Sequence, residues 1–478
     1  MNIIDLLRNN VKKYPSKIGF IDQEKEITFQ NMLKNVEIFS SSKLFQNKNE
    51  VVGLILENSI EDIIAYLGII HSGKIVHIIP PKITEKNFIN QIQSSKPSII
   101  ICSEKNKINF SNFDTKNIPI YTHKEVIVKS VNKVKNQKIN KVAYLIYTSG
   151  TTSEPKGVPI SHEMIEFTTK NIVKILGYSK NDIDLTPLPL YHSFGLGCLH
   201  TSIYVGSTFV ILKNANNLEN ILNSLKKFNA TTLAAVPATL TKFLNFEKLF
   251  LEEKFSNIRL IITNSTLIPK DTVNNFKTVI KNRKLATYYG LTEASRSTFM
   301  IFNENSSLDT SVGKPAPEVK IKIKKFDKKS KIGEIWIQGE NVIKKYWKNP
   351  IADRNLKNGW LQTGDVGYLD NNKNLFLVGR NDDIINIGGE KVIPNEIEEI
   401  IKQIPEIEDV VAFGIDNKIF GKTIKVNIIK KKNSNLNKIK ILSYCLKNLE
   451  KFKIPSKIEF VDKIPKNEYG KVKRSILK

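Results

Sequence analysis

Short apolar runs alternate with stretches of helix-spaced apolar residues along most of the chain. Residues 51–56 form a continuous apolar run, 60–71 place apolar side chains at helical spacing, and 74–79 are again apolar. A buried strand, a helix and a second buried strand in this order predict a βαβ unit. Similar runs predict further strands at 98–102, 142–147, 208–212 and 258–263. The alternation indicates an α/β fold with mainly parallel sheets flanked by helices.

The pattern changes near residues 379–383. A strand-like run at 374–378 precedes this point. After it the sequence predicts helices at 394–403 and 436–449 and strands at 410–415, 422–429 and 457–461. We therefore expect a large domain over 1–380 and a small α+β C-terminal domain over 381–478. A short polar boundary suits relative motion of the two domains. By composition alone, the polar, Lys-rich residues 465–478 are typical of a frayed end.

The charge of the chain is strongly positive, with a formal value of +26 over 478 residues. Such an excess can indicate nucleic acid, a membrane surface or polyanionic substrates. Here Lys and Arg are spread along both predicted domains, and no nucleic-acid-binding motif is recognised. We therefore expect no nucleic-acid partner, and interpret the excess as an ordinary Lys-rich surface.

The cysteines and the apolar stretches bear on location. The three cysteines, Cys102, Cys198 and Cys445, are widely spaced and form neither a metal-ligand cluster nor a disulfide framework. This usage favours a reducing cytoplasm. The N-terminus lacks the apolar core of a signal peptide. The longest apolar stretch, 63–80, contains two His and a Lys, so no membrane span is expected.

The strongest motif is the segment 147–158, Tyr-Thr-Ser-Gly-Thr-Thr-Ser-Glu-Pro-Lys-Gly-Val. An apolar strand runs into small and hydroxylated residues and then reaches Lys156. Gly150 lets the backbone turn where a Cβ would clash. Hydroxyl groups beside backbone N–H groups suit phosphate oxygens, and the lysine adds a positive charge. The spacing differs from a Walker A loop. The hydroxyl donors of this predicted phosphate loop are Thr148, Ser149, Thr151 and Thr152.

With this motif the chain resembles the adenylate-forming superfamily, which holds acyl-CoA synthetases, peptide-synthetase adenylation domains and luciferases. The resemblance covers essentially the whole chain, with the motifs in the family order. It implies that the loop binds the β- and γ-phosphates of ATP. The family usually has Gly where Ser153 stands, which we interpret as the mark of a branch.

Two further blocks match the family. In Tyr-Tyr-Gly-Leu-Thr-Glu, residues 288–293, an aromatic face can stack on a purine and a carboxylate suits Mg²⁺. By resemblance, Tyr289 lies against adenine, Thr292 contacts the α-phosphate and Glu293 holds Mg²⁺. A carboxylate can also accept both hydrogen bonds of a ribose diol. The resemblance assigns this role to Asp365. It also implies that Arg380 contacts the ribose and phosphate.

The C-terminal domain carries the remaining predictions. By resemblance, Lys471 moves in to bridge the carboxylate and the α-phosphate, where a fixed ammonium offsets the repulsion between two anions. Asp382 occupies the position at which the family hinges. In a second orientation of the domain, Gly389 would leave room for pantetheine and Lys391 would contact CoA phosphates.

The identity of the acid is predicted less sharply. By resemblance, His192 and Phe194 lie at the acyl site. No acidic residue occurs from 185 to 212, and an unpaired ammonium in a pocket is costly, which argues against an amino-acid substrate. The polar residues at 264–266 favour a small or polar acid, or they reshape the side of the pocket that contacts adenine. Ser153 and the turn at 388–392 also resemble oxalyl-CoA synthetase-like members.

The sequence thus predicts an acyl-CoA synthetase that uses ATP and Mg²⁺ to activate a small-molecule carboxylic acid and transfers the acyl group to coenzyme A. An acyl-AMP ligase that loads the phosphopantetheine arm of an acidic acyl carrier protein is the alternative. A third hypothesis is a nucleotide-binding relative without catalysis. The retained Lys156, Glu293, Asp365 and Lys471 argue against that third hypothesis.

Overall fold

The chain divides into two compact units in the computed structural model. The first unit is Met1–Lys320 with Ile337–Leu361, and the second is Ile321–Trp336 with Gln362–Lys478. The structure describes residues 1–478 except 24, 48, 131–137, 149–154, 214–216, 265–267, 282, 303–309, 327, 329, 388–389, 418–420, 433, 467–471, 473 and 478. The predicted boundary at 380–383 concerns motion between conformations and stays a prediction.

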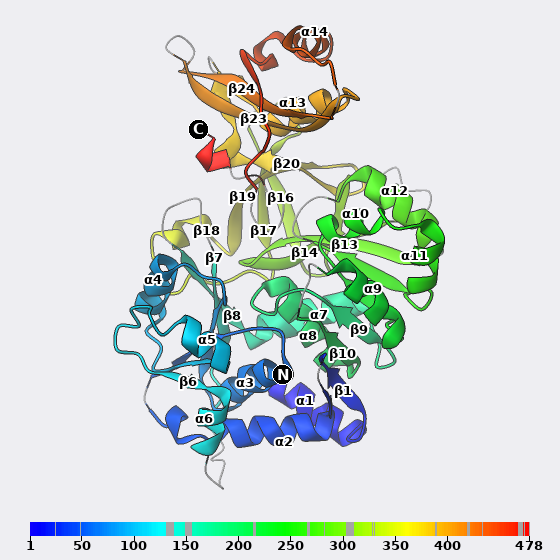
Figure 1. The fold of residues 1–478 in the computed structure, drawn as a ribbon. Coiled ribbons are helices and arrows are strands. Elements are labelled where there is room, and N and C mark those ends of the chain that lie inside the picture. Colours follow the sequence, from blue (N-terminus) through cyan, green and yellow to red (C-terminus); the bar gives the residue numbers. More distant parts are fainter. Residues whose placement is uncertain are drawn as a thin grey trace. The chain divides into compact units, whose positions relative to one another are not determined.

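One sheet of the first unit has a parallel centre and antiparallel edges (Figure 1). Its strand order is β2-β1-β10-β9-β11-β12-β13-β14-β15. The central strands β1, β10, β9, β11, β12 and β13 pair in parallel with one another. Strands β2, β14 and β15 pair antiparallel with their neighbours. The bounds are β1 Ile18–Ile21, β2 Glu26–Thr28, β9 Ile183–Thr186, β10 Thr208–Ile211, β11 Thr232–Ala234, β12 Leu260–Thr263, β13 Lys284–Leu291, β14 Ala294–Phe302 and β15 Ser311–Pro315.

The other sheet of the first unit has the order β6-β5-β3-β4-β7-β8 and is parallel except for the β7–β8 pair. Its buried strands are continuous apolar runs, as parallel strands covered on both faces should be. The bounds are β3 Val51–Ile55, β4 Ile75–Ile79, β5 Ile100–Cys102, β6 Ile120–Thr122, β7 Val142–Thr148 and β8 Lys156–Ser161. A two-residue strand, β18 Leu356–Lys357, completes the strands of this unit.

A layer of helices lies between the two sheets. Helix α7 contacts β8 of one sheet and β14 of the other, α3 contacts β3 and β4, and α1 joins α3 to α8 (Figure 1). Helices α9–α12 gather beside β9 and β13. The helices of this unit are α1 Ile3–Lys13, α2 Phe29–Ser40, α3 Ile60–His71, α4 Glu85–Ser95, α5 Glu104–Asn109, α6 His123–Val128, α7 His162–Leu176, α8 Ser193–Val205, α9 Leu218–Lys227, α10 Pro237–Phe243, α11 Lys248–Lys254 and α12 Lys270–Val279.

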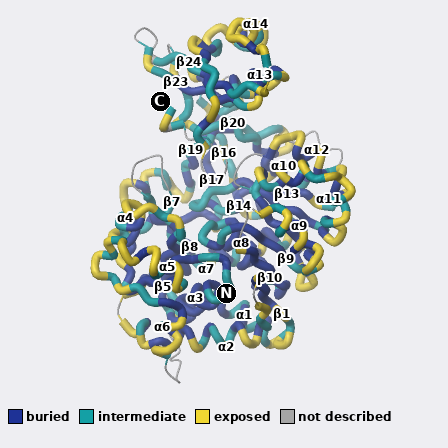
Figure 2. Tube along the Cα trace, in the orientation of Figure 1, coloured by how far each residue is buried: buried dark blue, intermediate teal, exposed yellow. Residues whose placement is uncertain are grey.

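The helices begin where the sequence supplies caps. The hydroxyl of Ser59 accepts a hydrogen bond from the backbone N–H of Asp62 at the start of α3, and Ser161 caps α7 in the same way. Gly177 and Gly206 end α7 and α8 in the left-handed conformation that favours glycine. Apolar side chains of the strands and inner helices are buried, and exposed positions lie on outer helices such as α2 and α11 (Figure 2).

The second unit combines strands and helices around a core of its own. Strands β16 Lys320–Lys325, β17 Gly333–Gln338, β19 Trp360–Leu369 and β20 Leu375–Arg380 follow one another in one sheet. A three-stranded sheet is formed by β23 Ile407–Asn417, β24 Gly421–Lys430 and β25 Lys457–Phe460. A hairpin of β21 Ile385–Ile387 and β22 Glu390–Val392 and the helices α13 Pro394–Lys402 and α14 Lys438–Asn448 complete the regular elements.

The apolar pattern predicted these elements closely. Residues 60–71 form α3, 142–148 form β7, and Pro394 begins α13. The fold class is confirmed: α/β, with a large N-terminal part and a smaller C-terminal one. Helix α14 begins two residues later than predicted because the side chain of Asn437 caps it. In the part of the chain that the structure describes, no helix is long and apolar enough to span a bilayer.

The expectation of a frayed end at 465–478 is wrong for the described residues there. Val472 and Leu477 pack against Val411, Phe413 and Ile464. The guanidinium of Arg474 donates to a carboxylate oxygen of Glu398 at 2.6 Å and to the backbone oxygen of Ala412 at 3.3 Å. These contacts outweigh the polar composition of the segment.

One carboxyl group is fully buried in the first unit. Asp184 in β9 is 0% exposed and accepts a hydrogen bond from Thr232 at 2.5 Å. Burial raises its pKa from 3.8 to about 7. Between these pH values the folded state holds a proton that the unfolded state has lost. This group therefore makes the stability fall as the pH rises from about 4 to 7.

We predict that Asp184→Asn removes this contribution. The amide preserves the shape and the hydrogen bond from Thr232, so over pH 4–7 the stability of the variant should fall less, or rise more, with pH than that of the wild type, by up to about 1.4 kcal/mol per pH unit. Buried His71, His77 and His162, with pKa values lowered to about 4 by burial, act with the opposite sign in both proteins. Denaturant unfolding at several pH values measures the difference, and equal slopes would contradict it.

Candidate active site

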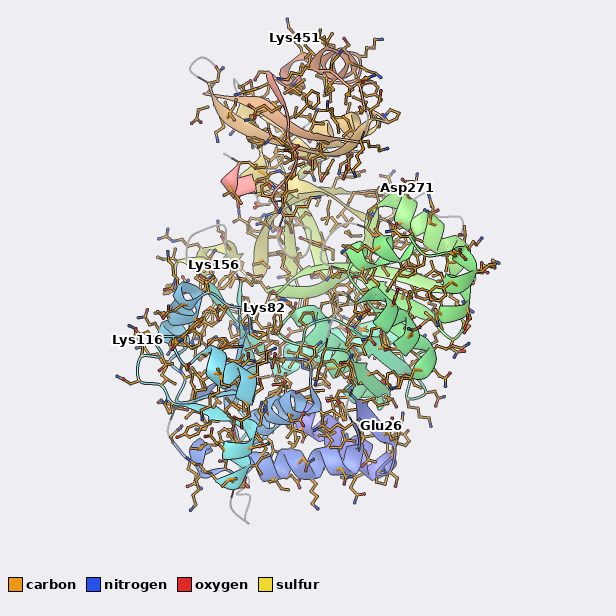
Figure 3. The ribbon with its side chains drawn as sticks, viewed as in Figure 1. Glu26, Lys82, Lys116, Lys156, Asp271 and Lys451 are labelled. Carbon is orange, nitrogen blue, oxygen red and sulfur yellow. The ribbon has the colours of Figure 1, made fainter. Side chains whose placement is uncertain are left out.

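The predicted phosphate loop connects two antiparallel strands. Strands β7 and β8 pair so that Thr148 lies directly opposite Lys156. The lysine therefore stands at the neck of the hairpin, where Figure 3 shows it at the end of β8. Four predicted phosphate ligands fall in the connecting turn and lie outside the described residues: Ser149, Gly150, Thr151 and Thr152.

A distant segment packs on the neck of this hairpin. The backbone N–H of Trp347 donates to the backbone oxygen of Gly157 at 2.8 Å. A Cβ at Gly157 would lie 3.0 Å from the Cβ of Trp347 and 3.1 Å from the ring of Tyr147. Glycine at this position therefore lets the segment approach closely. The contact fixes where the residues just before Trp347 lie relative to the phosphate loop.

A second hairpin carries the predicted α-phosphate and Mg²⁺ residues. Leu291 pairs with Ala294 at the end of β13 and β14, so Thr292 and Glu293 form its two-residue loop. A Cβ at Gly290 would lie 2.4 Å from the backbone nitrogen of Arg296, which explains the glycine of this motif. The sequence analysis identified these residues but did not predict that they form the tip of a long hairpin.

Tyr346 joins the two hairpins. Its hydroxyl donates to a carboxylate oxygen of Glu293 at 3.3 Å, and the ammonium of Lys156 lies 6.0 Å from the centre of its ring. Burial, with the charge of Glu293 beside it, raises the pKa of this tyrosine above its usual value, so the hydroxyl keeps its proton. Tyr346 belongs to no motif, so it could not be recognised from the sequence.

The aromatic residues of the second hairpin are buried. Tyr288 and Tyr289 are consecutive in β13, so their side chains point to opposite faces of the sheet. The ring of Tyr288 meets that of Phe194 edge to face, with 5.4 Å between the ring centres. Burial raises the pKa of Tyr288 to about 12. The predicted acyl-site residue Phe194 therefore lies beside the predicted adenine-binding strand.

The segment that contains His192 is held by a buried amide. The side-chain N–H groups of Asn58 donate to the backbone oxygens of Leu188 and Leu212 at 3.0 and 2.8 Å. Its side-chain oxygen accepts from the backbone N–H of Leu190 at 2.9 Å. His192 follows as the residue that precedes α8, with its ring 4.4 Å from that of Tyr191. The sequence analysis did not identify Asn58, which positions this segment.

A small cavity lies between the two sheets, beside Thr292. Its volume is about 20 Å³, enough for one water molecule. Strands β7 and β8, helices α7 and α8 and the β13–β14 hairpin contribute its walls. Arg296 and Ser193 line it together with Thr292. The structure thus brings the start of α8, next to His192 and Phe194, to the same cavity as the predicted α-phosphate residue.

A larger cavity of about 460 Å³ lies in the first unit beyond the ends of β3, β5 and β6. Its walls include Glu57, Asn58, Asp62, Ser103 and His123, and none of the predicted site residues. Size therefore does not identify the site, because the predicted chemistry gathers elsewhere.

In the second unit, two predicted ribose ligands pair with each other. Asp365 lies opposite Arg380 across β19 and β20, and a guanidinium nitrogen donates to its carboxylate at 2.7 Å. Gly364, with a φ of +72°, adopts the left-handed conformation just before the aspartate. A Cβ there would lie 3.1 Å from the guanidinium. The pair fixes the orientation of the carboxylate.

The other predicted residues of the second unit are dispersed. Asp382 is exposed, with its carboxylate 4.0 Å from the guanidinium of Arg380. The ammonium of Lys391 lies 4.3 Å from the centre of the Phe326 ring. Gly389 and Lys471 lie outside the described residues. An isolated antiparallel backbone bridge joins Lys466 to Val472.

The residues fit a metal ion that arrives with phosphates. Within the described residues, no group of three or more His, Cys, Asp and Glu side chains is arranged to hold a metal. Mg²⁺ needs no such group, because in proteins it is usually bound by one or two carboxylates together with substrate phosphates. Glu293 can supply such a carboxylate, and Tyr346, which donates to it, has its ring centre 6.0 Å from the Lys156 ammonium, a charge that suits phosphates.

Comparison with known proteins identifies the family of the chain. The sequence profile of the AMP-binding enzyme family matches residues 7–347, and that of the AMP-binding enzyme C-terminal domain matches 396–471. The chain is 28% identical to a long-chain-fatty-acid–CoA ligase of Haemophilus influenzae, covering 100% of this chain and 94% of that protein. It is also 28% identical to an oxalate–CoA ligase of Arabidopsis thaliana, covering 99% and 97%.

A solved structure supports the same family assignment. The o-succinylbenzoate coenzyme A synthetase of Bacillus subtilis, in complex with ATP and magnesium ion, matches with a TM-score of 0.86 and 25% identity over 98% of both chains. The family profiles together span most of the chain. The chain therefore belongs to the family of AMP-binding enzymes and is an AMP-forming acid–thiol ligase of the acyl-CoA synthetase type.

Proposed function

We propose that this ligase binds the triphosphate of ATP at the β7–β8 hairpin and activates its acid beside the tip of the β13–β14 hairpin. The overall reaction has two steps. A carboxylate oxygen attacks the α-phosphorus of ATP and pyrophosphate leaves; the sulfur of coenzyme A then attacks the acyl carbon and AMP leaves. The observation that carries the assignment is Tyr346, whose hydroxyl donates to Glu293 and whose ring centre lies 6.0 Å from the Lys156 ammonium.

The charges of these residues match the needs of the first step. Lys156 would hold the phosphate oxygens, with the hydroxyl groups of the turn from Thr148 to Thr152 beside it. Glu293 would hold Mg²⁺, which neutralises phosphate charge when bound. Thr292 would donate to the α-phosphate as the acid approaches. Tyr289 would lie against adenine.

The second unit would supply the remaining ligands of the nucleotide. Arg380 holds the carboxylate of Asp365 in one orientation, which supports the binding of both ribose hydroxyls by this carboxylate. Arg380 itself would reach the ribose and phosphate. Lys471 would bridge the attacking carboxylate and the α-phosphate.

A change in the orientation of the C-terminal residues would then serve the second step. Asp382 is the proposed hinge, and its exposure and its position in a short turn support this role. Gly389 would leave room for pantetheine, and Lys391 would contact CoA phosphates. His192 and Phe194 would line the acyl site.

Coenzyme A is the acceptor we assign, and the phosphopantetheine arm of a carrier protein is the alternative. The positive charge of the chain suits either acceptor. A cytoplasmic location is also part of the proposal, and the three buried free cysteines support it.

We predict that an oxygen atom of the acid appears in AMP. With a carboxylate labelled with ¹⁸O, ATP and CoA, mass spectrometry should find one labelled oxygen in AMP and none in pyrophosphate. ATP should be converted to AMP rather than ADP. Label retained in the thioester and absent from AMP, or ADP as the product, would contradict attack at the α-phosphorus.

We predict that thioester forms on free CoA. Enzyme, ATP, Mg²⁺ and a substrate acid should give acyl-CoA at a rate that adding holo-carrier protein does not increase. Thioester found on the carrier protein alone would replace our assignment by the alternative.

We predict that Tyr346→Phe weakens the use of MgATP. The change removes the hydrogen bond to Glu293 but keeps the ring beside Lys156, so the KM for MgATP should rise about 2- to 10-fold, as expected for one hydrogen bond. The Mg²⁺ concentration for half-maximal rate should rise with it, while the KM for the acid stays unchanged. Tyr121→Phe, in the distant β6, is the matched control. An unchanged Mg²⁺ dependence would show that Tyr346 does not position Glu293.

We predict that Lys471→Ala separates the two half-reactions. Adenylation, measured as ATP–pyrophosphate exchange, should be abolished because the ammonium between the two anions is lost. Thioester formation from supplied acyl-AMP and CoA should be largely preserved. An equal loss in both assays would argue against two orientations of the C-terminal residues, and Lys463→Ala serves as a control.

A further inference from the structure

A buried arginine in the acyl region forms no ion pair with any residue that the structure describes. Arg296 in β14 is 6% exposed, and its Nε has no hydrogen-bond partner. One terminal nitrogen donates to the hydroxyl of Ser295 at 2.7 Å, and the other lies 3.4 and 3.5 Å from the backbone oxygens of Ser193 and Phe194. The guanidinium also lies 5.0 Å from the centre of the Tyr288 ring. These contacts satisfy only some of the five N–H donors of the guanidinium.

In the described part of the chain, the charge of Arg296 is not compensated by an acidic side chain. Among the residues that the structure describes, no carboxylate forms an ion pair with Arg296. The neighbouring His200 is neutral, because burial and then the charge of Arg296 lower its pKa to about 3. A buried charge without a partner is costly, so its retention calls for an anion that comes from outside the chain.

The surroundings of Arg296 are built around its guanidinium. A Cβ at Gly197 in α8 would lie 1.7 Å from a terminal nitrogen, so only glycine leaves this space. The φ of Arg296 is +55°, a left-handed conformation that is strained for a non-glycine residue. Such strain gathers at functional sites, where the surrounding structure holds it.

The guanidinium faces the cavity that contains Thr292. Hydroxyl groups of Thr168, Thr169 and Ser295 and apolar side chains such as Ile165 line the rest of this cavity. The cavity as it stands holds one water molecule, so its walls must move apart to admit any acid, and a short acid requires the smallest movement. A ligand that reaches from Thr292 to Arg296 is therefore short, and the positive charge of Arg296 favours an anionic group at that end.

We propose that Arg296 binds the second carboxylate of a short dicarboxylic acid whose first carboxylate is activated beside Thr292. The proposal rests on the function assigned above. A carboxylate is the partner that a guanidinium binds with two parallel hydrogen bonds, and it supplies the missing counterion. Arg296 is then the residue that selects the acid, and it takes no part in the bond changes.

The test is ATP–pyrophosphate exchange with matched acids. Oxalate, malonate and succinate are compared with acetate, propionate and butyrate, and with octanoate, palmitate and benzoate as longer and aromatic acids. We expect kcat/KM for the best dicarboxylate to exceed that for each monocarboxylate by about 100-fold or more, because a site that pairs a buried charge rejects acids without the second anion. A preference for any monocarboxylate would overturn the inference while leaving the proposed function intact. Failure of every acid would overturn both.

Two substitutions sharpen the test. Arg296→Met should lower kcat/KM for the dicarboxylate by about 100-fold and leave monocarboxylates unchanged or improved. Arg283→Met, which removes an arginine distant from this cavity, should change neither. An equal loss for both classes of acid would assign Arg296 a structural role and contradict the inference.

A third variant tests the proposal even if Arg296→Met does not fold. Arg296→Lys keeps a buried charge but loses the two parallel hydrogen bonds. It should raise the KM for the dicarboxylate about 10-fold or more without changing the KM for ATP. An unchanged KM for the dicarboxylate would overturn the proposal, and thermal unfolding shows whether each variant is folded.

Discussion

The antiparallel hydrogen-bond register at two hairpins is the constraint on which the active site depends. It places Lys156 opposite Thr148 at one neck and leaves Thr292 and Glu293 as the tip of the other. Both hairpins extend sheets whose other strands are mainly parallel and buried. A rigid core thus carries short, polar ends, which is how α/β proteins position binding groups on a stable scaffold. Tyr346 contacts Glu293 at the tip of the second hairpin, and its ring centre lies 6.0 Å from the Lys156 ammonium at the neck of the first.

The layer of helices between the sheets provides the second half of the site. Helix α8 begins beside the second hairpin because Asn58 holds the segment before it with three hydrogen bonds. Gly197 lets the helix pass the guanidinium of Arg296. The two sides of Thr292 that we propose for the nucleotide and for the acid therefore differ in their balance of charges. Lys156 on one side has Glu293 nearby, whereas Arg296 on the other has no anion among the described residues.

Much of this arrangement could be predicted from the sequence. Continuous apolar runs revealed the buried strands, and the motifs in order predicted the residues proposed to bind the nucleotide, because backbone turns and phosphate contacts demand particular side chains at fixed spacing. Tyr346, Asn58 and Arg296 could not be predicted in this way. Each acts through a partner far along the chain or on another element, and only the packing of those elements brings the partners together. The C-terminal residues were misjudged by composition because a few apolar side chains there pack on β23.

The central claim is that the turn between Thr148 and Lys156 binds the triphosphate of ATP. A crystal structure with a non-hydrolysable ATP analogue and Mg²⁺ tests it most directly. The account predicts phosphate oxygens within hydrogen-bond distance of that turn and of the Lys156 ammonium, with the metal on Glu293. A triphosphate bound elsewhere, with the turn making no contact to it, would contradict the account.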